Sequence, residues 1–385
     1  MSDMRFSGAA EVASLFLLQA PLRSLEATGC RTRLPAGPAA TLAARVRTFF
    51  ATPRSGPALL VGALPFDPHA DDALFQPEQL TTPDLHGRGP LPVLAGEIVA
   101  EPPAAAYADA VAQALVRLQA AAGAPCKVVL ARSLHAQAAQ PVNPRALAAR
   151  LGRDASVATY VAPLPVAEER EPAWLVGASP ELLISRRGTA IVSHPLAGSA
   201  RRSADPAEDA RIAERLLASA KDLDEHRYVV DAIVEALKPL CGELDAPERP
   251  GLHATATMWH LGTRITGTLK DAAVSAAELA GLLHPTPAVC GTPREPALAA
   301  IQTLEPVARG FYAGAVGWTD AEGDGDWYVA IRCAHVQGTA LRLFAGAGIV
   351  AESRPEAEVD ETAGKFMAML NALGIDDEQA LSDKG

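Results

Sequence analysis

The stretch FAGAGIV at residues 344–350 is followed closely by EAEVDETAGKF at residues 356–366. The first segment is apolar, contains two glycines and is typical of the end of a β-strand. The second segment begins an acidic helix, in which Glu358, Glu361 and Lys365 share one face because they are three and four residues apart. Two carboxylates beside a glycine-rich turn can hold a hard cation, although most charged helix faces are simply solvated.

Composition restricts the class of protein. The chain has 385 residues, of which 49% are apolar, so it can bury a large core. Its formal net charge of −11 argues against nucleic acid or an anionic membrane as partner. No apolar run is long enough for a transmembrane helix, and the short segment at residues 12–18, preceded by Glu11, is a poor signal peptide. The five scattered cysteines contain no C-x-x-C pair, which favours a reducing cytoplasm over a disulfide framework or a zinc site.

Two apolar strand candidates carry side chains suited to proton transfer. The run KVVLAR begins with Lys127. A lysine buried there without a partner would have a lowered pKa and could act as a base, whereas a lysine at a solvated strand edge could not. Residues 174–178 are expected to form a strand, and Glu181 follows it, before a hairpin over residues 182–193. A carboxyl group at the rim of apolar strands can act as a general acid, or it can be an ordinary turn glutamate.

Further candidates lie between these strands and the C-terminal stretch. The small residues of PLAGSARR, residues 195–202, suit a backbone cradle for an anion. Glu225 lies in the first turn of a helix that is expected to begin near Asp222, where a carboxylate is favourable on dipole grounds alone. Residues 238–252 are rich in proline and glycine and are expected to form a linker.

Three strands are expected to close the chain, at residues 313–319, 327–336 and 341–350. Arg332 would lie inside the second of them, between apolar neighbours. Because a buried arginine needs an anionic partner, Arg332 is a candidate for binding a carboxylate.

Many ordered stretches of the chain together match one family. They are VGALPFD (61–67), KVVLAR (127–132), GASPE (177–181), PLAGSARR (195–202), KDLDEH (221–226), LHPTPA (283–288), GAVGW (314–318), IRCA (331–334), FAGAGIV (344–350) and ETAGK (361–365). With these stretches the chain resembles the chorismate-utilising enzymes, and most closely the isochorismate synthases of siderophore and salicylate pathways. The resemblance covers nearly the whole chain and is strongest from Lys127 to Leu373.

The resemblance implies a fold. It is of the α+β class, with a large two-sheet antiparallel β-sandwich core, flanking helices and a deep central active-site cleft. It implies one catalytic domain over residues 1–375, with core motifs at 127–373, and residues 376–385 are expected to form a disordered tail. The strand-rich pattern is compatible with this fold but does not supply it.

The resemblance also implies catalytic and metal-binding roles. Lys127 would be the general base that activates water for attack at ring C2 of chorismate. Glu181 would be the general acid that protonates the departing C4 hydroxyl, and the product would be isochorismate. Glu225 and Glu361 would hold Mg²⁺, with Glu358 close to the metal. Mg²⁺ suits oxygen ligands and would orient the substrate dianion.

The same comparison implies the substrate contacts. The backbone at Gly198 and Ser199, with Lys365, would help to bind the ring carboxylate of chorismate. Arg332 and the amide of Gly346 would bind the enolpyruvyl carboxylate. The expected substrate-binding residues are Gly198, Ser199, His260, Ala288, Val289, Tyr312, Arg332, Phe344, Gly346 and Lys365.

Related functions stay open. Salicylate synthases tend to have a threonine at the position of Val289, so valine favours isochorismate as the final product. Anthranilate and aminodeoxychorismate synthases use ammonia from a glutaminase partner, lack the lysine at Lys127 and usually have threonine in place of Ser199. We therefore expect no glutaminase subunit, and we expect a monomer. A menaquinone-pathway isochorismate synthase is a further alternative.

A chorismate-binding protein without activity is the alternative from another class, but it would be marked by loss of the base, the acid or a metal carboxylate. His260 and His284 could be catalytic, although a hydrogen-bonded structural histidine is the simpler interpretation of each.

Overall fold

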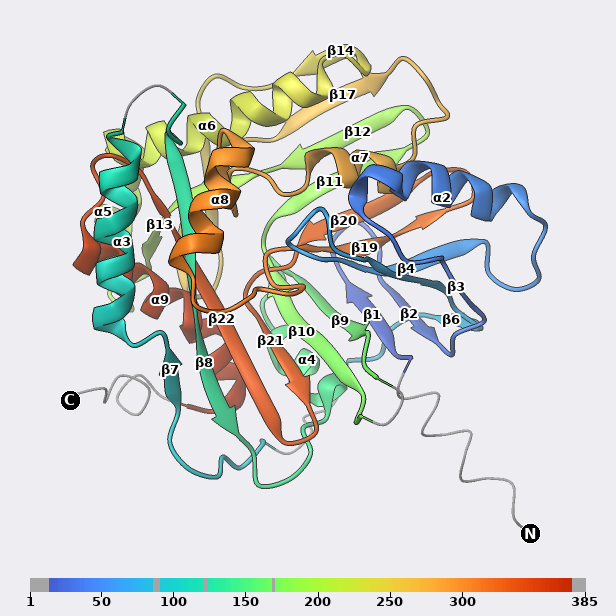
Figure 1. Cartoon of the computed structure of the whole chain (residues 1–385), viewed down its shortest axis with the longest axis horizontal. Helices are drawn as coiled ribbons and strands as arrows, with labels where there is room; N and C mark the ends of the chain where they lie inside the picture. The colour runs from blue at the N-terminus through green and yellow to red at the C-terminus, as the bar shows by residue number, and fades with distance from the viewer. Residues whose placement is uncertain (1–13, 86–90, 121–122, 168–169, 376–385) are drawn as a thin grey trace.

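The strands of the chain pair antiparallel throughout the part that the structure describes (Figure 1). Within it they form a ten-stranded, a nine-stranded and a three-stranded sheet. The expected tail at 376–385 lies outside the described residues. This computed structural model describes residues 14–85, 91–120, 123–167 and 170–375.

The two large sheets carry most of the fold. In order across the ten-stranded sheet lie β18 (Gly291–Thr292), β8 (Lys127–Gln137), β22 (Ala340–Ile349), β21 (Cys333–Gln337), β10 (Ala173–Ser179), β9 (Ala158–Leu164), β1 (Phe16–Gln19), β2 (Leu25–Thr28) and β6 (Gln79–Thr81), and β7 (Val99–Glu101) pairs with β8. In order across the nine-stranded sheet lie β14 (Cys241–Asp245), β17 (Ile265–Leu269), β12 (Ala190–His194), β11 (Leu182–Arg187), β20 (Gly325–Val329), β19 (Ala315–Asp320), β4 (Leu59–Leu64), β5 (Ala73–Gln76) and β3 (Thr32–Arg33).

The expected fold is confirmed, with one addition. A separate three-stranded sheet, which the sequence did not indicate, lies beside the two large ones and consists of β13 (Leu196–Arg201), β16 (Met258–Gly262) and β15 (Gly251–Ala254). The helices lie outside the sheets (Figure 1). They are α2 (Ala39–Ala51), α3 (Ala104–Leu118), α4 (Pro144–Leu151), α5 (Pro206–Ala218), α6 (Ala220–Leu237), α7 (Ala276–Leu283), α8 (Arg294–Leu304) and α9 (Pro355–Leu373).

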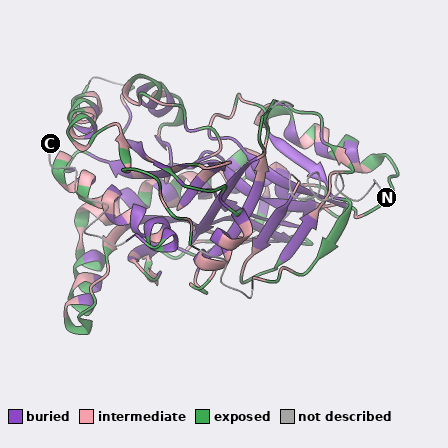
Figure 2. Cartoon of the chain, turned by 90° about the horizontal axis from the view of Figure 1, so that it is seen from below, coloured by how far each residue is buried: buried purple, intermediate pink, exposed green. Residues whose placement is uncertain are grey.

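Both faces of the ten-stranded sheet are buried, because successive residues of a strand point to opposite faces. Phe16 and Leu18 of β1 pack in the core between the two large sheets. Leu17 between them packs in a second core, which α4 and α9 cover. Figure 2 shows the strands as the buried centre of the molecule. This two-sided burial explains why the strands are continuous apolar runs in the sequence.

Two connections between the large sheets run side by side. The chain crosses from β10 to β11, and it returns from β20 to β21. Since β10 pairs with β21 and β11 with β20, the two crossings are neighbours. The Ala178 amide donates to the Arg332 carbonyl (3.1 Å) and the Val329 amide donates to the Glu181 carbonyl (3.1 Å). The crossings therefore hold Glu181 and Arg332 close together.

Two expected elements are wrong. The single strand expected over residues 327–336 is two strands, β20 and β21, which belong to different sheets. Arg332 lies in the break between them, with a left-handed backbone (φ 52°) that is uncommon for a residue with a side chain. The linker expected over residues 238–252 contains the strand β14 and the start of β15.

The C-terminal strand and helix are confirmed. β22 leads into a tight turn, in which the Ser353 amide donates to the Val350 carbonyl (3.0 Å), and α9 follows. α9 ends at Gly374, whose φ of 78° satisfies the left-handed cap that the glycine predicts. In the described part of the chain, none of the helices combines the length and the apolar character needed to span a membrane.

Candidate active site

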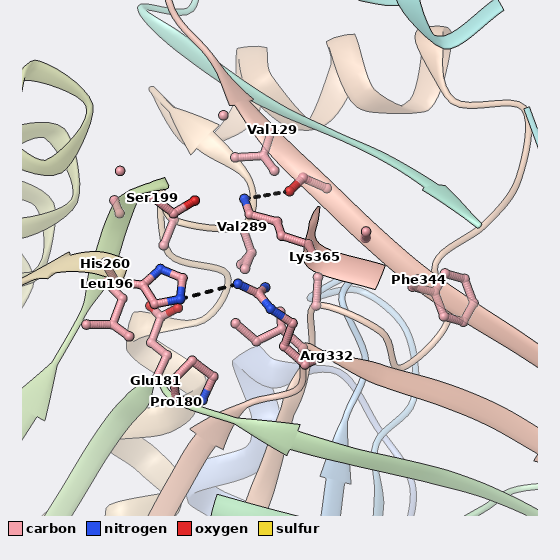
Figure 3. Close-up of a pocket in the computed structure, with 18 of the residues that line it drawn as sticks. Val129, Pro180, Glu181, Leu196, Ser199, His260, Val289, Arg332, Phe344 and Lys365 are labelled. Carbon is pink, nitrogen blue, oxygen red and sulfur yellow. Dashed lines mark hydrogen bonds between the residues drawn. The ribbon is translucent and has the colours of Figure 1, made fainter. Parts of the chain in front are cut away.

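A cavity lies where the crossings, the strands β8 and β22 and the three-stranded sheet meet (Figure 3). Its volume is about 630 Å³, including its open mouth. It collects most of the residues that the sequence predicts for the site. Those that line it are Glu181, Gly198, Ser199, Glu225, His260, Ala288, Val289, Tyr312, Arg332, Phe344, Gly346 and Lys365.

The predicted base, Lys127, lies behind the lining residue Glu225. Its Nζ is 2.9 Å from Glu225 Oε1, and its side chain is 0% exposed. The contact is an ion pair without hydrogen-bond geometry, so Nζ has no hydrogen-bond partner among the described residues. A buried donor in this state is costly and is typical of a group that meets a ligand. Lys127 is therefore neither the unpaired buried lysine nor the solvated strand-edge lysine that the sequence suggested.

A glycine makes room for this ion pair. Gly348 lies on β22, which pairs with β8 beside Lys127. A Cβ atom at Gly348 would lie 2.1 Å from Glu225 Oε1 and 2.9 Å from Lys127 Cε. The second glycine of the GAG segment at residues 346–348 is therefore needed so that Lys127 and Glu225 can approach each other closely.

The predicted acid, Glu181, is almost completely buried (3% exposed) at the first crossing. Burial raises its pKa to about 8, although the charges of Lys127 and Arg332 favour the ionised form. Glu181 is therefore protonated at neutral pH. A buried carboxylic acid that carries its proton at pH 7 can donate that proton to a leaving group.

Each expected metal carboxylate contacts a lysine. Among the described residues, no three His, Cys, Asp or Glu side chains are grouped tightly enough to hold a metal ion as they stand. The carboxylates point to ammonium groups instead, and Ser199 Oγ also donates to Glu361 (3.2 Å). The ion pairs are Lys127–Glu225 (2.9 Å), Lys221–Glu358 (2.7 Å) and Lys365–Glu361 (2.6 Å).

The electrostatics nevertheless fit a divalent cation. Burial, and then the charge of Glu361, raises the pKa of Glu358 to about 7. Burial acts in the same direction on Glu361, but Lys365 and Lys221 outweigh it and hold the pKa of Glu361 below its ordinary value. Glu358 Oε2 is buried without a hydrogen-bond partner in the described chain. Two close carboxylates with an unsatisfied oxygen suit the oxygen-rich coordination of Mg²⁺.

Arg332 adds a cationic group to the cavity wall. Arg332 Nη2 lies 3.5 Å from His260 Nε2 (Figure 3). Burial, and then the charge of Arg332, holds the pKa of His260 well below its ordinary value, so the imidazole is neutral. Arg332 forms no ion pair with any described residue. Because a buried guanidinium needs an anionic partner, this position suits a ligand carboxylate.

Apolar residues complete the wall. The rings of Tyr312 and Phe344 are stacked, with centroids 4.8 Å apart and planes inclined by 9°. Val289 lies in the loop after His284. The Nε2 atom of His284 is 3.0 Å from the Pro65 carbonyl, and His284 does not line the cavity. The two polar ends of the cavity are thus joined by a surface that suits the apolar face of a ring.

Sequence reasoning assigned no role to two residues that organise this site. Lys221 holds Glu358 and lies in electrostatic reach of Glu225, which is four residues later on α6. The spacing of four residues could have indicated that Lys221 and Glu225 share one face of a helix. Buried Arg309 donates to the Val289 and Val129 carbonyls (2.7 Å each) and so fixes two parts of the wall. No local pattern identified Arg309.

Comparison with known proteins identifies the class. Residues 88–374 match the family described as chorismate binding enzyme. The chain therefore belongs to the chorismate-binding enzyme family, as its motifs predicted.

The similar proteins within this family include several named isochorismate synthases. Isochorismate synthase DhbC of Bacillus subtilis (strain 168) is 48% identical over 330 residues, which are 83% of this chain and 81% of that protein. The vibriobactin-specific isochorismate synthase of Vibrio cholerae is 40% identical over 322 residues, which cover 83% of this chain and 80% of that protein. The crystal structure of DhbC from Bacillus anthracis superposes with a TM-score of 0.89 at 41% identity, covering 95% of this chain and 98% of that chain.

Proposed function

We propose that the protein is an isochorismate synthase, an isomerase that converts chorismate to isochorismate. The observation that carries the proposal is that two buried ionisable groups lie at one cavity: Glu181 lines it, and Lys127 lies behind the lining residue Glu225. The raised pKa of Glu181, about 8, suits it to act as the acid. The exchange of a hydroxyl group for water requires an acid and a base near the same substrate. The similarity to named isochorismate synthases supports the same reaction.

The chemistry assigns one proton transfer to each group. Lys127, as the neutral amine, takes a proton from the water that attacks ring C2 and becomes the ammonium group. Glu181 gives its proton to the C4 hydroxyl, which leaves as water because hydroxide is a poor leaving group. The ring double bonds shift between these two carbons, so the substrate gains one water and loses one. The pKa of Glu181, about 8, keeps this acid protonated under neutral conditions.

The substrate is a dicarboxylate, and we assign one end of the cavity to each carboxylate. Arg332 and the backbone of Gly346 bind the enolpyruvyl carboxylate. Glu225, Glu361 and Glu358 would hold Mg²⁺, which would supply positive charge for the ring carboxylate in a protein of net charge −11. The other contacts of the ring carboxylate would be the backbone of Gly198 and Ser199 and the side chain of Lys365.

The remaining lining residues shape the cavity around the ring. Tyr312, Phe344, Ala288 and Val289 form its walls, and neutral His260 orients Arg332. Val289 also bears on the product, because salicylate-forming relatives tend to have threonine there. The valine matches the pattern of enzymes that form only isochorismate, and we therefore expect isochorismate to be released.

The biological setting is inferred from the relatives and the cysteines. The similarity to a vibriobactin-specific enzyme and to DhbC favours siderophore biosynthesis, through 2,3-dihydroxybenzoate or salicylate. All five cysteines are free, which suits the cytoplasm. We also propose one catalytic domain over residues 1–375, acting as a monomer without a glutaminase subunit. Size-exclusion chromatography with light scattering tests the monomer.

One experiment tests the function. Purified protein is incubated with chorismate and Mg²⁺, and the products are separated by chromatography. Isochorismate alone is the expected result. Salicylate with pyruvate would assign the chain to the salicylate synthases, and anthranilate on addition of ammonia would contradict both assignments. A parallel incubation with EDTA measures the dependence on the metal.

A further inference from the structure

A second cavity adjoins the catalytic one. It shares Pro180 and Arg332 with the catalytic cavity, so the two cavities meet at these residues. We call it the vestibule. Its volume is about 1070 Å³ including its mouth. Its walls are the loop at residues 152–157 after α4, the β15–β16 turn at residues 255–257 and the end of α9.

Arginine side chains line the vestibule, although the protein as a whole is acidic. Arg150 and Arg153 line it together with Arg332, and Asp154 is the one acidic residue among its described lining residues. Arg150 Nε donates to the carbonyl of Ala372 (2.7 Å), which ties its guanidinium to the end of α9. Arg153 is exposed and forms no ion pair with any described residue.

The single acidic side chain is occupied by backbone contacts. Asp154 Oδ1 accepts from the Ser156 amide (3.0 Å), and Oδ2 accepts from the Ala256 amide (2.7 Å). These bonds join the 152–157 loop to the β15–β16 turn and so fix the mouth of the vestibule.

We propose that the vestibule is the route by which a small dicarboxylate reaches the catalytic cavity. Arg153 attracts one carboxylate from solvent, and Arg332, which belongs to both cavities, receives it. A local cationic path raises the rate at which an anion finds its site, and it is needed here because the protein as a whole repels anions. The identity of the dicarboxylate as chorismate rests on the proposed function.

The test measures chorismate binding rather than turnover. In a Glu181→Gln background with Mg²⁺, so that chorismate is not consumed, stopped-flow tryptophan fluorescence gives the association and dissociation rate constants. Ala256→Trp narrows the mouth at an exposed position. Because a route is used in both directions, both rate constants should fall by the same factor, with Kd unchanged. The matched control is Ala106→Trp, on the exposed face of α3.

A charge reversal tests the arginines. Arg153→Glu should lower the association rate constant by roughly tenfold at low salt. It should also make that constant less sensitive to added salt, because screening acts on the attraction that has been removed. Arg249→Glu, at an exposed position outside both cavities, changes the net charge equally and should leave the association rate close to that of the parent.

Two results would overturn the proposal. One is unchanged rate constants in both Ala256→Trp and Arg153→Glu. The other is a weaker Kd in Ala256→Trp with association unchanged, which would make the vestibule part of the binding site rather than a route. The two proposals fail separately: absence of isochorismate from the unmodified protein contradicts the proposed function, whereas normal production with unchanged rate constants in both variants contradicts the route alone.

Discussion

Lys127 and Glu225 form a buried ion pair, with Nζ 2.9 Å from Oε1. The contact joins the proposed base, on β8, to a proposed metal ligand, on α6. Base and metal site are therefore adjacent parts of one charged cluster. A change to either residue is expected to affect the other.

Lys127→Ala removes the proposed base. Isochorismate formation should fall by at least about 100-fold, because an unassisted water is a weak nucleophile. Glu225 would be left buried without a counter-ion, so the free energy of unfolding should fall by about 3–5 kcal/mol. Turnover and urea unfolding measure these two quantities, and calorimetry should show that chorismate still binds. Lys270→Ala, at an exposed lysine, is the control. Full activity in Lys127→Ala would refute the assignment.

Glu181 should impose an alkaline limit on activity. Its pKa of about 8 means that the proton it must donate is present below pH 8 and is lost above it. The value of kcat/KM is therefore expected to fall as pH rises through about 8. Glu181→Gln should abolish activity at every pH while chorismate still binds. A profile that stays flat to pH 9.5 would rule out Glu181 as the acid.

The same shift affects stability. Burial raises the pKa of Glu181 from 4.5 to about 8, so the folded state holds a proton that the unfolded chain has released between these two values. The contribution of Glu181 to the free energy of unfolding should therefore decrease from pH 4.5 to pH 8. Urea unfolding at several pH values should show that Glu181→Gln, compared with the unmodified protein, loses this decrease.

Glu361→Ala should weaken Mg²⁺ binding. Loss of a direct carboxylate ligand is expected to raise the Kd for Mg²⁺ by at least about tenfold, since even indirect partners of a metal matter this much. Isothermal titration with Mg²⁺ measures it without reference to activity. Glu356→Ala is a matched control, because Glu356 is an exposed carboxylate in the first turn of the same helix. Equal titrations for the two variants would remove Glu361 from the metal site.

Gly348→Ala should disrupt the Lys127–Glu225 ion pair without replacing either charged residue. The new Cβ would lie 2.1 Å from Glu225 Oε1, so the carboxylate must move, and overpacking of this kind costs about 1–3 kcal/mol. Turnover should fall with it. At Gly364, in the middle of α9, the nearest atoms to a new Cβ are at 3.6 Å or more. Gly364→Ala should therefore keep activity and gain up to about 1 kcal/mol in helix stability. Equal effects of the two changes would contradict this account.

Local sequence pattern predicted those site residues that sit at the ends of regular elements. Glu181 follows an apolar strand, and the charged face of α9 follows from the spacing of its carboxylates. The overall fold came from the ordered family motifs. The split of residues 327–336 into two strands could not be predicted, because a buried strand has the same apolar pattern whether it stays in one sheet or passes to another. Strand pairing decides that, and its partners lie far away in the sequence.

Of the three pairs of a carboxylate with a lysine, two could not be predicted from the sequence either. Spacing shows that Glu361 and Lys365 share a helix face, and the structure confirms that they pair. The contacts of Lys127 with Glu225 and of Lys221 with Glu358 join elements that are distant in the chain. No periodicity reports such contacts. They follow from the topology that places α6, α9 and β8 around one cavity.

The paired crossings between the sheets have a mechanical consequence. A clamshell opening of the sandwich at this point would break the hydrogen bonds that join Ala178 to Arg332 and Val329 to Glu181. The acid and the guanidinium therefore keep their separation while substrate arrives and product departs. Any motion that admits the substrate must therefore take place outside these two crossings. The hydrogen-bonded crossings thus hold the proposed acid and the proposed carboxylate-binding group at a constant distance throughout the reaction cycle.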